Sequence, residues 1–123
     1  MTLLADDVAL LAAFFREALK LSVEVAEEHY VAFGGEGIRF AIFSRAGMGA
    51  NTHDHADYRT PRRGQSFELN FECARQVDVD MGLKRIEHQG GVIVAAPVFT
   101  DWGHYTAFFS DPEGNIHSLF AVV

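Results

Sequence analysis

The pattern of apolar and polar positions predicts two helices, one in each half of the chain. In residues 7–20 (DVALLAAFFREALK) the apolar residues recur at helical spacing and form one stripe: Val8, Leu11, Ala12, Phe15 and Leu19. Residues 78–91 (DVDMGLKRIEHQGG) predict a second helix. Each helix opens on an aspartate followed by valine, and aspartate is a favoured N-cap. Gly90 and Gly91 supply the stop signal of the second helix.

The segments around these helices predict strands, and the two halves repeat one another. Short strand candidates precede the helices at residues 2–5 (TLLA) and 66–73 (SFELNFEC). After the helices, residues 30–43 (YVAFGGEGIRFAIF) and 105–120 (YTAFFSDPEGNIHSLF) share Tyr-x-Ala-Phe, a Glu-Gly turn, an Ile and a closing apolar strand. Both halves therefore read strand, helix, strand, strand, strand. Residues 44–66, rich in Gly, Thr, Asn and charge, predict a connector between them.

The stretch FFSDPEGNIHSLF at residues 108–120 predicts a hairpin. Pro112 sets the backbone of a turn's second position, and Gly114 and Asn115 tolerate positive φ. The apolar runs on both sides read as strands. His117 has the opposite parity to Ser118, so we expect it to face the helices as a hydrogen-bonded structural histidine.

Alternation also predicts which side chains of residues 66–73 share a face. Phe67, Leu69, Phe71 and Cys73 point one way, and Glu68, Asn70 and Glu72 point the other. We expect the apolar set to pack on the helices. The polar set then faces a binding cleft or, as for any half-buried strand, solvent.

Composition and charge narrow the possible partners. The 123 residues, 49% of them apolar, suffice for one domain with a real core. A formal charge of −7 without a basic face argues against nucleic acid and favours cationic ligands. The single cysteine excludes an internal disulfide and a thiolate zinc cluster, which makes a reducing compartment the default. The longest apolar run, residues 8–15, is far short of the roughly 20 residues of a membrane span. We expect a cytoplasmic protein without a membrane partner.

The duplicated module and the run WGHYTAFFSDPEGN resemble the vicinal oxygen chelate superfamily, which includes glyoxalase I, extradiol dioxygenases and bleomycin-resistance proteins. The resemblance covers essentially the whole chain. It implies an α+β fold in which two tandem βαβββ modules form a curved mixed sheet around a cleft, with helices on the outer face, and usually a homodimer. It also implies a single domain over residues 1–123, with module 1 at about 1–45, the connector at about 44–66 and module 2 at about 66–123.

The resemblance further implies where metal ligands stand in the metal-dependent members. The usual glutamate position, shortly after the hairpin turn, is Ser118, and its counterpart by the internal repeat is Phe40. The histidine that such members often carry in the first strand would fall before Met1. In the strand that opens the second module, they often read His-Leu-x-Phe, and this chain reads ELNF, so Glu68 stands at the histidine position. A Lewis-acid site needs about three protein ligands. We therefore expect no cofactor by the usual arrangement, while a divalent metal held by a shifted set such as Glu68 with His104 stays an alternative.

The resemblance implies that ligand-contacting side chains line the cleft of such a protein. These are Phe40, Glu68, Asn70, Glu72, Trp102, His104, Phe108, Ser118 and Phe120. His53 and His55 of the connector are predicted to lie in a solvated loop, because helical metal-ligand spacing is missing there.

Three functions fit this set. The first is a metal-free protein, similar to bleomycin-resistance proteins, that binds a cationic or aromatic small molecule. The second is a glyoxalase-like lyase or isomerase, or a dioxygenase, with a non-standard metal site. The third is a metal-free isomerase or lyase in which Glu68 is the catalytic base, which requires a carboxylate shielded from water.

Overall fold

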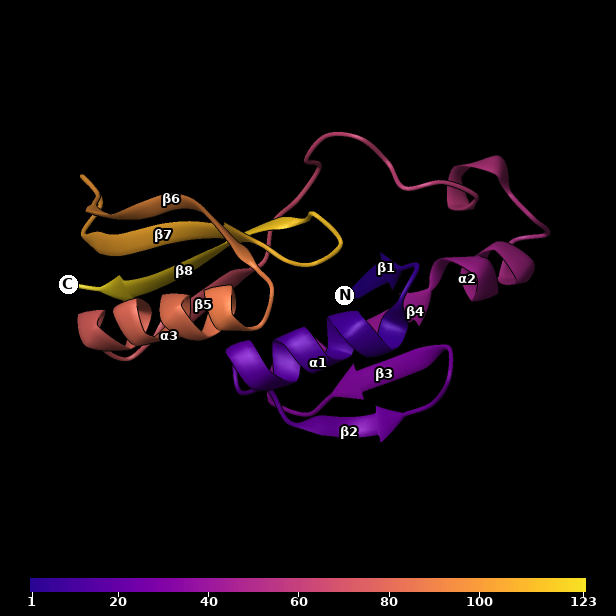
Figure 1. The fold of residues 1–123 in the computed structure, drawn as a ribbon, viewed down its shortest axis with the longest axis horizontal. Coiled ribbons are helices and arrows are strands. Elements are labelled where there is room, and N and C mark those ends of the chain that lie inside the picture. The colour runs from indigo at the N-terminus through magenta and orange to yellow at the C-terminus, as the bar shows by residue number, and fades with distance from the viewer. The chain divides into compact units, whose positions relative to one another are not determined.

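The computed structural model describes residues 1–123, which form two compact units. The first comprises residues 1–16 and 20–64, and the second comprises residues 17–19 and 65–123. Each contains one four-stranded sheet (Figure 1). No helix is both long and apolar enough to cross a membrane.

The first unit follows the predicted order of elements. Its elements are β1 (Thr2–Ala5), α1 (Val8–Ala18), β2 (Val23–Ala26), β3 (Tyr30–Phe33) and β4 (Phe40–Ser44). The strand order is β1-β4-β3-β2, in which β1 and β4 are parallel and the other pairs are antiparallel. The Asp7 carboxylate accepts a 3.0 Å hydrogen bond from the Leu10 amide, which confirms Asp7 as the predicted N-cap of α1.

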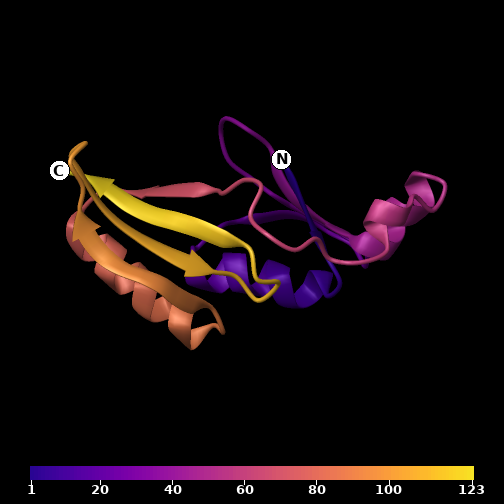
Figure 2. The same ribbon diagram turned by 90° about the horizontal axis from the view of Figure 1, so that it is seen from above.

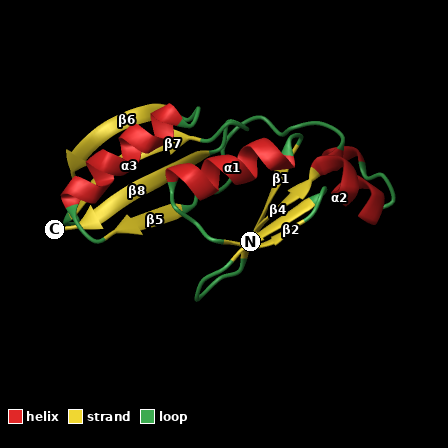
Figure 3. Cartoon of the chain, turned by 60° about the horizontal axis from the view of Figure 1, so that its bottom comes forward, coloured by secondary structure: helices red, strands yellow, loops and turns green.

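The second unit repeats this topology. Its elements are β5 (Asn70–Cys73), α3 (Gln76–His88), β6 (Val92–Phe99), β7 (His104–Ser110) and β8 (Ile116–Val122). The strand order is β5-β8-β7-β6, with β5 parallel to β8, and β7 and β8 run side by side (Figure 2). Helix α3 lies along one face of this sheet (Figure 3). The predicted α+β fold with two βαβββ modules is therefore confirmed.

The boundaries around α3 differ from those that the sequence predicts. The helix begins at Gln76, with Arg75 at the N-cap, so Asp78 is not the cap. Instead, the Arg75 side chain donates to both Asp78 carboxylate oxygens, at 2.9 and 3.1 Å. The predicted stop is confirmed, because the Gly91 amide donates to the Ile86 carbonyl and Gly90 has a φ of +93°. Strand β5 is shorter than predicted and starts at Asn70.

The predicted connector contains helical structure that the sequence did not suggest. Helix α2 (Arg45–Asn51) follows β4 directly, and a 3₁₀ turn, η1, spans Ala56–Tyr58. The Ser44 hydroxyl caps α2 by accepting a 2.9 Å hydrogen bond from the Gly47 amide. The sequence hid this helix because two of its seven residues are glycines, which are poor helix formers.

Candidate functional site

The sheet of the second unit has one face that packs on α3 and one that does not. The side chain of Leu119 lies on the α3 side, because a Cβ added at Gly82 would meet it at 2.8 Å. The Tyr105 hydroxyl also reaches α3 and donates a 2.8 Å hydrogen bond to Asp80. Since side chains alternate along a strand, the neighbours of Leu119 and Tyr105 face away from the helix. We call that opposite surface the open face.

Cross-strand pairing arranges the open face in two rows. One row runs from β5 to β6 through Asn70, Ser118, Phe108 and Ala95. The second row runs parallel to it through Glu72, Phe120, Thr106 and Val98. Directly paired residues on one face have their side chains in contact distance. The open face thus places polar groups from β5 beside aromatic rings from β7 and β8.

The first row is tied together by a short hydrogen bond. The Ser118 hydroxyl donates to the Asn70 side-chain oxygen at 2.6 Å. Ser118 is only 3% exposed, while Asn70 is exposed. This bond confirms that the two side chains share a face, as the alternation of β5 and the hairpin register require.

The second row carries an aromatic stack at its centre. The rings of Phe120 and His104 lie nearly parallel, with centroids 4.7 Å apart and an interplanar angle of 13°. Their positions are diagonal neighbours on β8 and β7, a separation that aromatic side chains can span. Trp102, in the turn before β7, has its ring centroid 6.5 Å from that of His104 and is 70% exposed. The stack therefore places two parallel aromatic rings beside the carboxylate of Glu72.

Thr106 stands between these rings and was not singled out from the sequence. Thr106 is 5% exposed, and its side-chain hydroxyl has no hydrogen-bond partner. It pairs with Phe120 on one side and Val98 on the other. A buried hydroxyl without a partner is costly and calls for a specific explanation. The signal in the sequence was its parity, which it shares with His104 and Phe108 in the strand HYTAFFS.

Most of the predicted ligand residues come together on this face, and two do not. Those brought together are Asn70, Glu72, His104, Phe108, Ser118 and Phe120. Trp102 lies at the edge. Glu68 precedes β5 and is exposed, so burial does not shield its carboxylate from water as a catalytic base would require. Phe40 belongs to the first unit.

The expectation that Phe40 is the counterpart of Ser118 in facing a cleft is corrected by its contacts. The Phe40 ring meets the ring of Phe15 on α1 edge-on, with centroids 5.1 Å apart, and stacks on Phe33 at 5.1 Å. Phe40 thus faces the helix, whereas Ser118 faces away from one. The sequence repeat was aligned with a register error of one residue, and such a shift moves a side chain to the other face.

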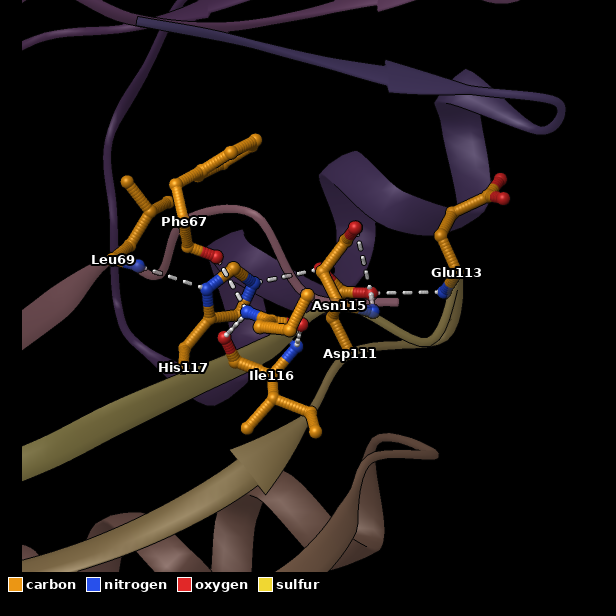
Figure 4. Close-up of polar contacts among 8 residues, drawn as sticks. Phe67, Leu69, Asp111, Glu113, Asn115, Ile116 and His117 are labelled. Atoms are coloured by element: carbon orange, nitrogen blue, oxygen red, sulfur yellow. Dashed lines mark hydrogen bonds and ion pairs between the residues drawn. The ribbon is translucent and has the colours of Figure 1, made fainter. Parts of the chain in front are cut away.

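The Asp-Pro-Glu-Gly-Asn hairpin is organised by the carboxylate of Asp111 (Figure 4). Its Oδ1 accepts hydrogen bonds from the backbone amides of Glu113 and Asn115, at 3.0 and 3.1 Å. The Asn115 side-chain amide donates to both carboxylate oxygens. Gly114, with a φ of +88°, supplies the left-handed backbone that the turn needs. The turn residues therefore serve the structure, and they set the direction of β8.

The same carboxylate bonds to His117, as Figure 4 shows. Both side chains are 0% exposed, and Asp111 Oδ2 lies 2.8 Å from His117 Nε2. His117 Nδ1 accepts a 3.2 Å hydrogen bond from the Leu69 amide, so the ring hydrogen must be on Nε2, which donates to Asp111. The predicted structural role of His117 is confirmed. The pair fixes the residue before β5 against β8.

Gln65 extends this attachment. Its side-chain amide donates to the carbonyl oxygens of Phe67 and Ile116, and its side-chain oxygen accepts from the Ile116 amide at 3.2 Å. The Ser118 amide in turn donates to the Leu69 carbonyl at 3.0 Å. These bonds hold β5 in register with β8, which is what brings Asn70 and Glu72 next to Ser118 and Phe120.

Two pKa shifts arise on the α3 side of the sheet. The hydrogen bond to Asp80 raises the pKa of the Tyr105 hydroxyl, because it favours the protonated phenol. Burial, reinforced by the negative charge of Asp78, raises the pKa of the Cys73 thiol. The only cysteine is thus a poor nucleophile and lies away from the open face.

The side chains at the expected metal-ligand positions do not fit a divalent metal. Ser118 carries a hydroxyl that is already bonded to Asn70, and Phe40 packs on α1. No group of three or more His, Cys, Asp or Glu side chains is close enough to hold a metal ion. His55 of the connector uses Nδ1 to accept from the Asp57 amide, and His53 is exposed with a φ of +54°. We therefore derive no metal-dependent step.

Residues 1–118 match the family described as the Glyoxalase/Bleomycin resistance protein/Dioxygenase superfamily. A family enzyme of that description from Burkholderia phytofirmans PsJN is similar in structure, with a TM-score of 0.90, 18% identity and coverage of 100% of this chain and 96% of that one. A glyoxalase-related enzyme from Fulvimarina pelagi has a TM-score of 0.86 and 16% identity, and the match covers 98% of this chain and 84% of that one. A lactoylglutathione lyase from Agrobacterium tumefaciens has a TM-score of 0.69 and 21% identity, and the match covers 98% of this chain and 90% of that one. No curated protein matches. At these identities the solved structures establish the fold alone.

Proposed function

Because the chain belongs to the Glyoxalase/Bleomycin resistance protein/Dioxygenase superfamily, we propose that it binds a small organic molecule on the open face of its second sheet, without the usual metal site. The observation that carries this proposal is the stack of His104 on Phe120 next to a buried hydroxyl that has no partner. Binding sites combine apolar and aromatic walls with a few placed polar groups, and this face has that composition.

Charge favours a cationic ligand. The protein has a formal charge of −7, and Glu72 stands beside Phe120 at the exposed edge of the face. A positively charged group is attracted both by a carboxylate and by the face of an aromatic ring. An aromatic amine satisfies both.

A screen with matched variants tests the proposal. Cationic and aromatic compounds are tested by thermal shift against the wild type, His104→Ala and Tyr105→Phe. His104 lies on the open face, whereas Tyr105 is its neighbour on the α3 side. We expect stabilising compounds whose effect is lost in His104→Ala and kept in Tyr105→Phe. Equal loss in both variants, or no stabilising compound, would contradict ligand binding at this face.

The metal-dependent alternative has its own test. A non-standard site would have to recruit donors such as His104 and Glu68, which the chain does not bring into one cluster. Elemental analysis of the purified, untagged protein, after incubation with zinc, nickel, manganese and iron(II) and then desalting, separates the two functions. We expect no metal to be retained, and near-stoichiometric metal would replace the binding proposal with an enzyme of the glyoxalase or dioxygenase type.

We also propose the homodimer that the family resemblance implies. Size-exclusion chromatography with light scattering measures it directly, and a mass of one 13.6 kDa chain at all concentrations would refute it.

A further inference from the structure

We infer that Thr106 is the specificity-determining residue of the open face, and that it selects planar ligands that carry a neutral hydrogen-bonding group. This inference rests on the proposed function. The ligand class is an aromatic ring with a hydroxyl, carbonyl or amide at one end and a basic amine at the other.

The Thr106 hydroxyl costs the folded protein free energy. It is buried, and no protein group satisfies it. Valine has the same shape and would avoid the penalty of burying an unbonded hydroxyl. The hydroxyl oxygen is closed to solvent in the free protein, so a ligand reaches it only by displacing a side chain that covers it. A ligand that then bonds to the hydroxyl removes the penalty, so the hydroxyl discriminates between ligands that can bond to it and those that cannot.

The neighbours of Thr106 determine which group it can accept. Its cross-strand partners are Phe120 and Val98, and its neighbours along β7 on the same face are His104 and Phe108. Among these four residues only His104 is ionisable, and its ring is stacked on Phe120. A charged ligand group placed there would be desolvated without compensation, whereas a neutral group needs only the one hydrogen bond.

The distance between Glu72 and Thr106 determines how far apart the two polar ends of the ligand must be. Glu72, Phe120 and Thr106 are consecutive in one row, on strands β5, β8 and β7. Adjacent strands are about 4.8 Å apart, so Glu72 and Thr106 are separated by roughly 10 Å with the Phe120 ring between them. His104 already stacks on Phe120, so a planar ligand lies along this row against the exposed edges of the two rings, with one substituent at the carboxylate and the opposite one at the hydroxyl.

The probes are tyramine and phenethylamine, which share a ring and an amine and differ only in one hydroxyl. Binding is measured by NMR titration, with chemical shift changes mapped to the residues of the open face. For the wild type we expect tyramine to bind roughly fivefold more tightly, the range of one net hydrogen bond. Thr106→Val should remove this preference, and Thr106→Ser, which keeps the hydroxyl, should retain it.

A second measurement does not depend on any ligand. Thr106→Val should raise the urea midpoint of the free protein, because it removes a buried polar group that lacks a partner. A lower or unchanged midpoint would mean that the hydroxyl is satisfied in the folded protein, which overturns the inference.

The outcomes separate the two proposals. If tyramine and phenethylamine bind to the open face equally well, and Thr106→Val changes neither affinity, the binding function stands and the role of Thr106 is refuted. If neither amine binds, or shift changes map elsewhere, the proposed function fails for this ligand class and the inference falls with it.

Discussion

His117 donates a 2.8 Å hydrogen bond from Nε2 to Asp111 Oδ2, and neither side chain is reached by solvent. The pair joins the hairpin turn to the first residue of β8 that faces α3, and through Leu69 to the start of β5. Its effect on the site is indirect. It sets the register in which Ser118 and Phe120 are presented beside β5.

Breaking this pair should destabilise the protein strongly. His117→Leu removes the imidazole partner of the buried Asp111 Oδ2 and the acceptor of the Leu69 amide, so we expect the free energy of unfolding to fall by about 2–4 kcal/mol. Urea denaturation measures the change. Asp111→Ala should cost at least as much, because it also removes the bonds to the Glu113 and Asn115 amides.

The double variant tests whether the two side chains act together. Residues in one hydrogen-bond network are not additive, so Asp111→Ala combined with His117→Leu should cost clearly less than the sum of the single changes. Strict additivity would show that the 2.8 Å contact does not contribute to stability.

The hairpin and its structural histidine were predictable because they depend on local signals. Pro112, Gly114 and Asn115 specify the turn, and parity alone sends His117 to the helix side. The faces of Asn70, Glu72 and Ser118 followed from the same alternation. The family resemblance, and not alternation, singled out His104, Phe108 and Phe120, which share the open face with them.

Phe40 and Thr106 show where the sequence was insufficient. Phe40 was placed by aligning two turns of different length, and one residue of register error reversed its face. Thr106 became visible only when its hydroxyl was found to lack a partner, since hydrogen bonding in three dimensions is not encoded in residue type. Helix α2 was missed because tertiary contacts outweigh the weak helix propensity of its glycines.

Two glycines in α2 should respond to alanine in opposite directions. A Cβ at Gly47 would meet both the Phe43 ring and the Ser44 hydroxyl at 2.7 Å, which disturbs the cap of the helix. A Cβ at Gly49 has its nearest neighbour at 3.8 Å, an ordinary contact. We expect Gly47→Ala to lower the free energy of unfolding by about 1–3 kcal/mol and Gly49→Ala to raise it by about 0.5–1 kcal/mol.

Chemical denaturation of both glycine variants measures the two shifts against the wild type. Because the residues lie in one helix, Gly49→Ala is the control for helix propensity. Stabilisation by Gly47→Ala would show that the Ser44 cap tolerates a side chain there.

The Arg75–Asp78 pair predicts a pH-dependent contribution at the start of α3. Hydrogen bonds from Arg75 hold the pKa of Asp78 below its ordinary value of 3.8. Folding therefore favours the ionised carboxylate, and the stabilisation is present above that value and disappears as the pH falls through the lower pKa of the folded state. Wild type should be more stable than Asp78→Asn near neutral pH, and the difference should shrink below pH 3.8.

Denaturant melts over a pH series measure this difference, and Arg75→Gln provides the control. In the Arg75→Gln background, Asp78→Asn should give a difference that varies much less with pH in this range, because the main cause of the lowered Asp78 pKa is gone and only the weaker effects of burial and of Arg85 remain. A pH-independent difference in the wild-type background would mean that the pair does not favour the ionised form.

Restoring a carboxylate at the position where the family's metal-dependent members carry one should not create a metal site. In Ser118→Glu the new carboxylate would replace the hydroxyl that bonds to Asn70, between Asn70 and Phe108 in the first row. Its neighbours supply one amide oxygen and no imidazole, and about three protein ligands are needed. Calorimetric titration with zinc, nickel and manganese should detect no stoichiometric binding, with Ser118→Gln as the uncharged control of similar size. Tight binding by Ser118→Glu alone would mean that Glu68 and Glu72 converge with residue 118, which would contradict the register that pairs Ser118 with Asn70.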